Sequence, residues 1–392
     1  MEKYVDGAVY LKKNIPGKLL RFFREKNEKF VIADIVGIVV LKKIIYVFLP
    51  KNTDESKINL NHLNILLNTL KKSTNLLTGV GNDNFELEKS DLTKTIEWLI
   101  NDFNNNGVYK VVEKDLYSGE GGKIQWDKTL KKEVPLYANE NLIFMDFVRK
   151  KKKISDSVIT QIHKHVLNNL SQNYGKFFNF NFSEVLNFRL SLTEINNILM
   201  KQLKVERNER KKNLILNLYN YLNLTSSENS EFYYVTRDFH VIFESALKSV
   251  MNHKKELKKY VPKAKWNLRI RNVEYSSKNT QIPDVLVVRK EFIDIYDAKY
   301  YSLIDFVERK GNKTTPLDWY SVGKQFLYDF TFPYEKIGYN PGTNNFVFPG
   351  YPITNFIKDI GDVSLSINGI SKKINVKLID TFDLLNKAFL SV

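Results

Sequence analysis

The chain has 392 residues, a formal net charge of +16 at pH 7 and no cysteine. This length exceeds one typical domain and allows two or three hydrophobic cores. The lack of cysteine excludes disulfides and thiolate metal sites and fits a reducing cytoplasm, which is the expected location. The positive charge favours a polyanionic partner such as double-stranded DNA.

The longest apolar stretch, residues 30–49, is interrupted by Asp34, Lys42 and Lys43. Charges at this spacing are incompatible with a membrane span, so the stretch predicts two strands and a turn. The first residues also lack the basic start, apolar core and small-residue cleavage site of a signal peptide. We therefore expect no membrane partner.

The pattern predicts a multidomain α+β or α/β protein in three parts: a mixed α/β domain over residues 1–115, a mainly helical region over residues 116–230, and a C-terminal domain over residues 231–392 with a mixed sheet flanked by helices. The N-terminal domain has helical patterns at residues 60–77 and 91–104. A Gly- and Ser-rich loop at residues 118–122 marks the first boundary. Helical spacing continues over residues 155–222, and residues 225–230 predict a linker.

Three elements in the C-terminal part carry acidic side chains. Apolar residues at helical spacing predict a helix over residues 238–247 that carries Glu244. Asp284 precedes a short β-branched run at residues 285–288 that is typical of a buried central strand. In the next strand, Asp297 and Lys299 share the parity of the apolar residues Ile293 and Ile295 and therefore point to the same side.

Asp284, Asp297 and Lys299 are residue types that hydrolyse phosphodiesters. A phosphodiester is anionic, so a divalent metal must offset its charge and activate the attacking water. Carboxylates are the hard oxygen ligands that Mg²⁺ prefers, and a lysine beside them can act on the water or stabilise the pentavalent phosphate. The alternative for such a triplet is a structural ion pair at the edge of a strand.

The same acid-x-Lys pattern occurs elsewhere in polar surroundings, where it predicts solvated helix faces or loops. These control pairs are Glu55/Lys57, Glu209/Lys211, Glu256/Lys258 and Glu308/Lys310. Only Asp297 and Lys299 end an apolar strand and follow a Pro-Asp pair closely.

Four further side chains have two interpretations each. Glu244 is either a carboxylate at the solvent boundary of its helix or a third metal ligand delivered by that helix. A helix predicted over residues 321–330 carries Lys324, Gln325 and Tyr328. We expect these three side chains to contact DNA phosphates or the active site. The alternative for Tyr328 is that it packs in the core.

This order of elements resembles the PD-(D/E)xK nuclease core. More narrowly, the chain is similar to the LlaJI-type restriction endonuclease family, relatives of the McrC nuclease subunit. The resemblance extends from about Val36 onward and includes residues 122–130 (GKIQWDKTL), Pro135, residues 159–167 (ITQIHKHVL) and residues 345–349 (NFVFP).

The resemblance implies metal-binding roles for Asp284 and Asp297, a catalytic role for Lys299 and a supporting acid at Glu244. It also implies a separate McrB-like AAA+ GTPase that docks on the N-terminal half. The chain itself contains no G-x-x-x-x-G-K-[ST] or G-x-G-x-x-G motif, so we expect it to bind no nucleotide. The expected cofactor is Mg²⁺, bound by the two aspartates.

Three functions remain open at this point. The chain is the cleaving subunit of a restriction system, or a non-catalytic activator that binds DNA and an NTPase ring, or a stand-alone repair nuclease or junction resolvase. The convergence of Asp284, Asp297 and Lys299 favours the first over the second. The third shares the chemistry but has no need of the long N-terminal and helical regions.

Overall fold

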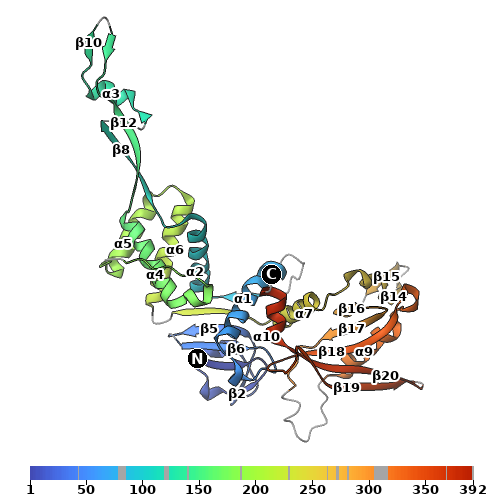
Figure 1. Cartoon of the computed structure of the whole chain (residues 1–392). Coiled ribbons are helices and arrows are strands. Elements are labelled where there is room, and N and C mark those ends of the chain that lie inside the picture. The colour runs from blue at the N-terminus through green and yellow to red at the C-terminus, as the bar shows by residue number, and fades with distance from the viewer. Residues whose placement is uncertain are drawn as a thin grey trace. The chain divides into compact units, whose positions relative to one another are not determined.

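The structure is a computed structural model of the whole chain (Figure 1). It describes residues 1–42, 44–77, 85–118, 123–138, 141–185, 188–227, 230–262, 264–270, 273–279, 282–303, 317–367 and 369–390. Contacts between residues divide the chain into two compact units. One unit comprises residues 1–90 together with residues 231–392, and the other comprises residues 91–230.

The N-terminal part of the first unit contains a five-stranded sheet in the order β1-β6-β5-β13-β7. Its strands are β1 (Glu2–Val5), β5 (Val36–Leu41), β6 (Ile44–Leu49), β7 (Leu87–Lys89) and β13 (Glu231–Thr236). A smaller sheet is formed by β2 (Val9–Leu11), β3 (Phe23–Glu25) and β4 (Phe30–Ala33). Buried aromatic and aliphatic side chains of the two sheets share one core.

The stretch at residues 30–49 forms three strands, β4, β5 and β6, where two were predicted. Asp34 lies between β4 and β5, where the chain passes from the smaller sheet to the five-stranded sheet. Helix α1 (Leu60–Leu77) is as predicted, and the predicted loop at residues 118–122 lies mostly outside the described residues.

The division of the chain differs from the three consecutive domains expected over residues 1–115, 116–230 and 231–392. The reason is β13, which pairs with β5 on one side and β7 on the other, both antiparallel. The first residues of the expected nuclease domain therefore complete the N-terminal sheet. Helix α2 (Asp91–Asn106) belongs to the second unit and packs against α6.

The C-terminal part contains a mixed five-stranded sheet in the order β16-β17-β18-β20-β19. Its strands are β16 (Val285–Arg289), β17 (Phe292–Ala298), β18 (Asn340–Gly350), β19 (Ile357–Ile367) and β20 (Ile370–Asp380). The central pairs β17–β18 and β18–β20 are parallel, and the two outer pairs are antiparallel. The mixed sheet with flanking helices is thus confirmed.

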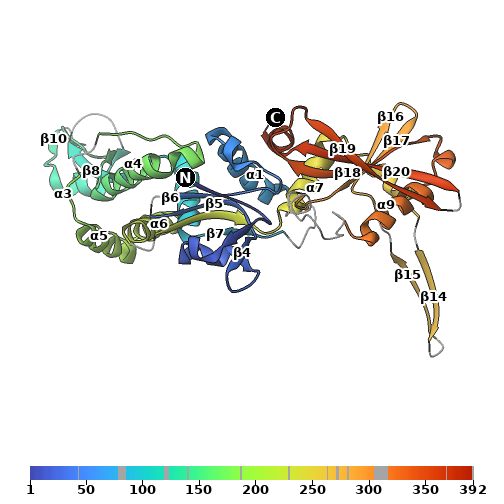
Figure 2. The same ribbon diagram turned by 90° about the horizontal axis from the view of Figure 1, so that it is seen from below.

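Helix α9 lies against one face of this sheet, as Figure 2 shows. Its residues Val322 and Phe326 pack with Phe346 and Phe348 of β18. The remaining elements of this part are α7 (Phe239–Val250), η5 (Lys255–Tyr260), the hairpin β14 (Ala264–Ile270) and β15 (Val273–Asn279), α9 (Trp319–Thr331), η6 (Glu335–Ile337), α10 (Thr381–Leu385) and η7 (Asn386–Leu390).

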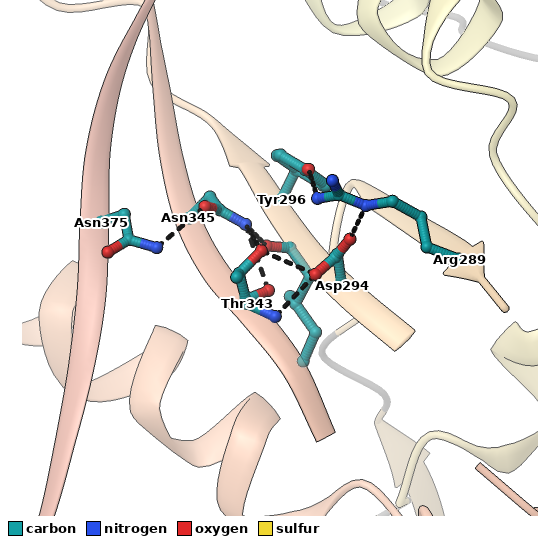
Figure 3. A network of polar contacts seen from close by, with 7 residues as sticks. Arg289, Asp294, Tyr296, Thr343, Asn345 and Asn375 are labelled. Atoms are coloured by element: carbon teal, nitrogen blue, oxygen red, sulfur yellow. Dashed lines mark hydrogen bonds and ion pairs between the residues drawn. The ribbon is translucent and has the colours of Figure 1, made fainter. Parts of the chain in front are cut away.

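A buried polar network fixes β17 against β18 on its other face (Figure 3). Asp294 accepts hydrogen bonds from the backbone N–H and the hydroxyl of Thr343, both at 2.6 Å, and forms a short ion pair with Arg289. The pairing of β17 with β18 shifts by one residue here, at Gly342, where a Cβ atom would lie 2.7 Å from the carbonyl oxygen of Ile293. The network therefore holds the register from which β17 continues to Asp297.

The second unit contains four long helices and a β-ribbon. The helices are α2, α4 (Val158–Phe178), α5 (Leu192–Val205) and α6 (Glu209–Ser226). Ser157 and Ser191 begin α4 and α5 with capping boxes, which supply hydrogen bonds to otherwise unpaired N–H groups. Helix α6 extends to Ser226, into the predicted linker at residues 225–230, of which residues 228–229 lie outside the described parts.

The ribbon is an addition that the sequence did not predict in a middle region expected to be mainly helical. Strand β8 (Val111–Ser118) pairs with β12 (Val148–Ser155) along its full length. Because Val111 pairs with Ser155 and Ser118 with Val148, the described residues between the strands, 123–138 and 141–147, form the distal tip. The tip contains β9 (Lys123–Ile124), α3 (Trp126–Lys132), β10 (Leu136–Ala138) and β11 (Asn141–Ile143). In the described parts, helices that combine the length and the apolar character needed to cross a bilayer are absent.

Candidate active site

The antiparallel pairing of β16 with β17 places two carboxylates side by side. Val285 pairs with Tyr296, so Asp284, the residue before Val285, lies beside Asp297 at the end of β17. Oδ2 of Asp284 accepts a hydrogen bond of 2.8 Å from the backbone N–H of Ala298. The prediction that the two acids lie on neighbouring strands is therefore confirmed.

Lys299 directs its ammonium group at Asp297. Its Nζ lies 2.5 Å from Oδ2 of Asp297, and the two residues are only 9% and 3% exposed. Oδ2 nevertheless accepts no hydrogen bond of good geometry from the described residues, so the contact is an ion pair rather than an aligned hydrogen bond. The prediction that the side chains of Asp297 and Lys299 point to the same side of the strand is confirmed.

The protonation of Asp284 reflects this crowding. Burial, together with the nearby carboxylates of Asp297 and Glu244, raises the pKa of Asp284 from 3.8 to about 7, against the Ala298 N–H group and Lys248, which lower it. Because two carboxylates side by side repel each other, the pair favours a proton or a cation between them.

Glu244 lies on α7 and forms a short ion pair with Lys248, one turn further along the helix. It is near enough for its charge to affect Asp284. Over the described residues, no group of three or more His, Cys, Asp or Glu side chains is arranged to hold a metal ion. Glu244 as a third ligand therefore stays a prediction, while Asp284 and Asp297 form a two-carboxylate site.

Helix α9 contributes buried side chains next to the pair. Nε2 of Gln325 donates to Oδ1 of Asn344 at 2.6 Å, and Oε1 of Gln325 is buried without a partner among the described residues. The Tyr328 hydroxyl donates to the carbonyl of Ile282 at 3.2 Å. Burial raises the pKa of Tyr328, and the charges of Asp297 and Asp284 contribute. Tyr328 is therefore packed in the core, and its hydroxyl also lies near the two carboxylates.

The ammonium of Lys324 lies over the ring of the same tyrosine. Its Nζ lies 5.4 Å from the centroid of the Tyr328 ring. A DNA contact by Lys324, Gln325 or Tyr328 stays a prediction.

Sequence reasoning missed two cationic groups beside the carboxylates, Lys248 and Lys258. Burial lowers the pKa of Lys258, and the positive charge of Lys248 lowers it further, against the carboxylates of Glu244 and Asp284. Lys258 had been assigned to a solvated control pair, whereas η5 holds it near the site. The available signal was the spacing of Glu244 and Lys248, which places them on one face of α7.

The raised pKa of Asp284 predicts a dependence of stability on pH. A carboxyl whose pKa is higher in the folded state than in the unfolded state stabilises the fold fully below the unfolded pKa, and this contribution is lost as pH rises through about 7. We expect the free energy of unfolding of the wild type to fall relative to that of Asp284→Asn between about pH 4 and about pH 7. Denaturant titrations of both proteins across this range measure the difference, and a constant difference would contradict the raised pKa.

Three comparisons with known proteins bear on this site. The family model described as "LlaJI restriction endonuclease" matches residues 35–380. The "Type II restriction enzyme BsuMI component YdjA" of Bacillus subtilis (strain 168) is 27% identical over 283 residues, and the match covers 64% of this chain and 56% of that protein. The chain thus spans little more than half the length of this relative.

Among solved structures, the chain is similar to one from a half-complex of Thermococcus gammatolerans McrB AAA+ hexamers with bound McrC. The likeness covers 98% of both chains at 11% identity, with a TM-score of 0.35. A score this low supports no argument about fold or partners.

Proposed function

The chain belongs to the LlaJI restriction endonuclease family, and on this premise we propose that it is the Mg²⁺-dependent DNA-cleaving subunit of a restriction system. The observation that carries the proposal is the half-buried Asp284 beside the buried Asp297, with the ammonium of Lys299 2.5 Å from Asp297. The proposal includes the assignment of the C-terminal sheet and its helices as a PD-(D/E)xK core.

The residues present fit a magnesium ion. Burial and the nearby carboxylates of Asp297 and Glu244 raise the pKa of Asp284, and the buried Oδ2 of Asp297, which the ammonium of Lys299 approaches to 2.5 Å, accepts no hydrogen bond from the described residues. Both observations describe negative charge that a cation would stabilise, and Mg²⁺ prefers carboxylate oxygens. When bound, the ion would polarise the phosphate and lower the pKa of a bound water.

The protein side chains have distinct tasks in this proposal. Asp284 and Asp297 hold the ion, and Lys299 either orients and deprotonates the attacking water or stabilises the charge on the pentavalent phosphate. A non-catalytic activator has no need of the second carboxylate, because Lys299 already pairs with Asp297 and Asp284 then adds only repulsion. The activator and the stand-alone nuclease remain the alternatives that the tests below must exclude.

Metal binding tests the site without any partner. We expect Mg²⁺ or Mn²⁺ at millimolar concentration to raise the unfolding midpoint of the wild type at pH 8, because an ion that binds only the folded state stabilises it. The increase should be lost in Asp284→Asn and Asp297→Asn. Asp362→Asn, which changes an aspartate of β19 in the same sheet, is the matched control and should keep the increase. Equal metal responses in all four proteins would exclude the two-carboxylate site.

We further propose that a McrB-like AAA+ GTPase supplies nucleotide hydrolysis, since the chain has no phosphate-binding loop of its own. The ribbon tip is the part of the second unit that best suits such docking. Leu136, Tyr137, Leu142 and Ile143 of the β10–β11 hairpin are 46–75% exposed. Apolar side chains gathered at one exposed hairpin are typical of an interaction surface.

Substitution at the tip tests the docking. We expect the double variant Leu136→Ser/Tyr137→Ser to lose complex formation with the proposed McrB-like AAA+ subunit, because the apolar contact area is removed. Size-exclusion chromatography of the mixture with nucleotide measures the complex, and Val185→Ser, which changes an exposed apolar residue elsewhere in the second unit, is the control. An intact complex with the double variant would place the docking surface elsewhere.

A further inference from the structure

The segment after β6 reaches the end of strand β17 within the first unit. Asn52, in this segment, has a φ of 59°, in the left-handed region that asparagine tolerates better than most residues. Its Nδ2 donates to the carbonyl oxygens of Tyr301 and Pro349 at 2.8 and 3.0 Å, and its Oδ1 accepts from the backbone N–H of Leu303 at 2.6 Å. One side chain thus joins the residues that follow Lys299 to the end of β18.

The backbone around Asn52 strengthens this junction. The carbonyl of Asn52 accepts from the N–H of Tyr351 at 3.1 Å, and the N–H of Asp54 donates to the carbonyl of Tyr351 at 2.8 Å. Thr53 and Tyr351 form a parallel β-bridge. The segment therefore runs beside the continuation of β18 as a short additional strand.

Tyr300, the residue after Lys299, is held from the same side. Its hydroxyl donates to the carboxylate of Asp6 and accepts from the backbone N–H of Lys51 at 3.3 Å. The ammonium of Lys51 lies 4.7 Å from the centroid of the Tyr300 ring and 3.9 Å from Oδ2 of Asp6. Asp6 directly follows β1 and Lys51 follows β6, so both belong to the N-terminal sheet region.

Lys299 lies just beyond the end of β17, where the strand ladder no longer fixes the chain. Its N–H still donates to the carbonyl of Val347 at 2.8 Å, and its carbonyl accepts from the N–H of Tyr301 at 3.0 Å. Beyond this point the contacts of Asn52, Lys51 and Asp6 determine the path of the chain. A lysine side chain is long and has many rotamers, so the position of its ammonium depends on how firmly its backbone is held.

We propose that Asn52 is a positioning residue for Lys299, and that the N-terminal sheet region is in this way a working part of the nuclease site. The inference rests on the proposed function, since it assigns Asn52 to the reaction that Lys299 serves. Asn52 does not touch the carboxylates itself. It acts by fixing the backbone on which Lys299 is carried, and small displacements of a reacting group reduce rates strongly.

Asn52→Gly is the appropriate test, because glycine keeps the left-handed backbone while all three side-chain hydrogen bonds are lost. Asn179→Gly is the matched control, since Asn179 is also left-handed, with a φ of 49°, and ends α4 in the other unit. Asn52→Asp keeps the acceptor for the Leu303 N–H but loses both donated bonds, and should have an intermediate effect.

Two measurements separate positioning from general stability. Amide hydrogen exchange at residues 299–303 should become at least ~10-fold faster in Asn52→Gly, because the Leu303 N–H loses its acceptor. The single-turnover cleavage rate with the partner and Mg²⁺ should fall by about 10- to 100-fold, while the dissociation constant for DNA in Ca²⁺ stays unchanged. Asn179→Gly should match the wild type in both measurements.

A cleavage rate of Asn52→Gly within twofold of the wild type would overturn the inference. Lys299→Ala, measured in parallel, keeps that failure distinct from a failure of the proposed function. If Lys299→Ala is inactive and Asn52→Gly is fully active, only the positioning role is wrong. If Lys299→Ala cleaves at the wild-type rate, the catalytic assignment of Lys299 itself is wrong.

Discussion

Replacing Asp297 by alanine is expected to reduce the rate of DNA cleavage by at least ~10³-fold while the protein stays folded. The carboxylate would hold the metal ion that stabilises the transition state, and metal sites supply several kcal/mol of such stabilisation. The assay combines the variant, the proposed AAA+ partner, nucleotide and Mg²⁺, and follows the first turnover on DNA. The substitution relieves Asp284 of a repelling neighbour but leaves the ammonium of Lys299 without its ion-pair partner, so circular dichroism is used to select conditions in which the variant is folded.

Asp362→Ala is the control for this substitution. Asp362 is an aspartate of the same sheet, but it is 44% exposed and lies 3.3 Å from Lys373 in an ion pair of the kind that contributes little. Its cleavage rate should equal that of the wild type. Cleavage by folded Asp297→Ala at the wild-type rate would remove the catalytic assignment and favour the activator alternative.

Lys299→Ala is expected to lose the chemical step but to keep the affinity for DNA. An ammonium that acts only on the attacking water or on the developing phosphate charge contributes to the transition state and not to the bound ground state. Removal of such a group typically costs 10²- to 10⁴-fold in rate, as an order of magnitude. Binding is measured in Ca²⁺ and turnover in Mg²⁺.

The chain provides its own control for Lys299. Lys57 follows Glu55 in the same acid-x-Lys pattern, but it lies in the exposed turn η3 (Glu55–Lys57). Lys57→Ala should cleave at the wild-type rate. If Lys299→Ala instead loses DNA affinity and cleavage by the same factor, Lys299 is an anchor for the DNA backbone rather than a group that acts on the reacting atoms.

Local patterns in the sequence were sufficient for several elements. Helix α1 has the predicted bounds, because apolar residues recur at helical spacing over its whole length. The alternation of residues in β17 was likewise enough to place Asp297 and Lys299 on one side of the sheet. Asp284 was predicted near them because it begins the neighbouring strand-like run, but that run was expected to be a central strand and β16 instead lies at the edge of the sheet.

Non-local pairing explains what the sequence did not reveal. The partners of β13 lie more than a hundred residues away along the chain, and no periodic pattern records such a pairing. In the ribbon, the basic run at residues 149–153 interrupts the alternation that marks a strand. The contacts of Asn52 with the end of β17 are equally distant in sequence, so a polar residue in a short loop gave no signal.

The pairing of β7 with β13 has a consequence for how such a chain can change. Tyr234 pairs with Lys89 and Thr236 with Leu87, so the chain leaves the sheet region after β7 and returns in the adjacent antiparallel strand. All 140 residues from Asp91 to Ser230 are inserted between two hydrogen-bonded neighbours. An insertion whose ends meet in this way can be lengthened, shortened or exchanged at little cost to the host fold. The first unit can therefore keep every residue around Asp297 while a single continuous segment of the gene, residues 91–230, is replaced by another.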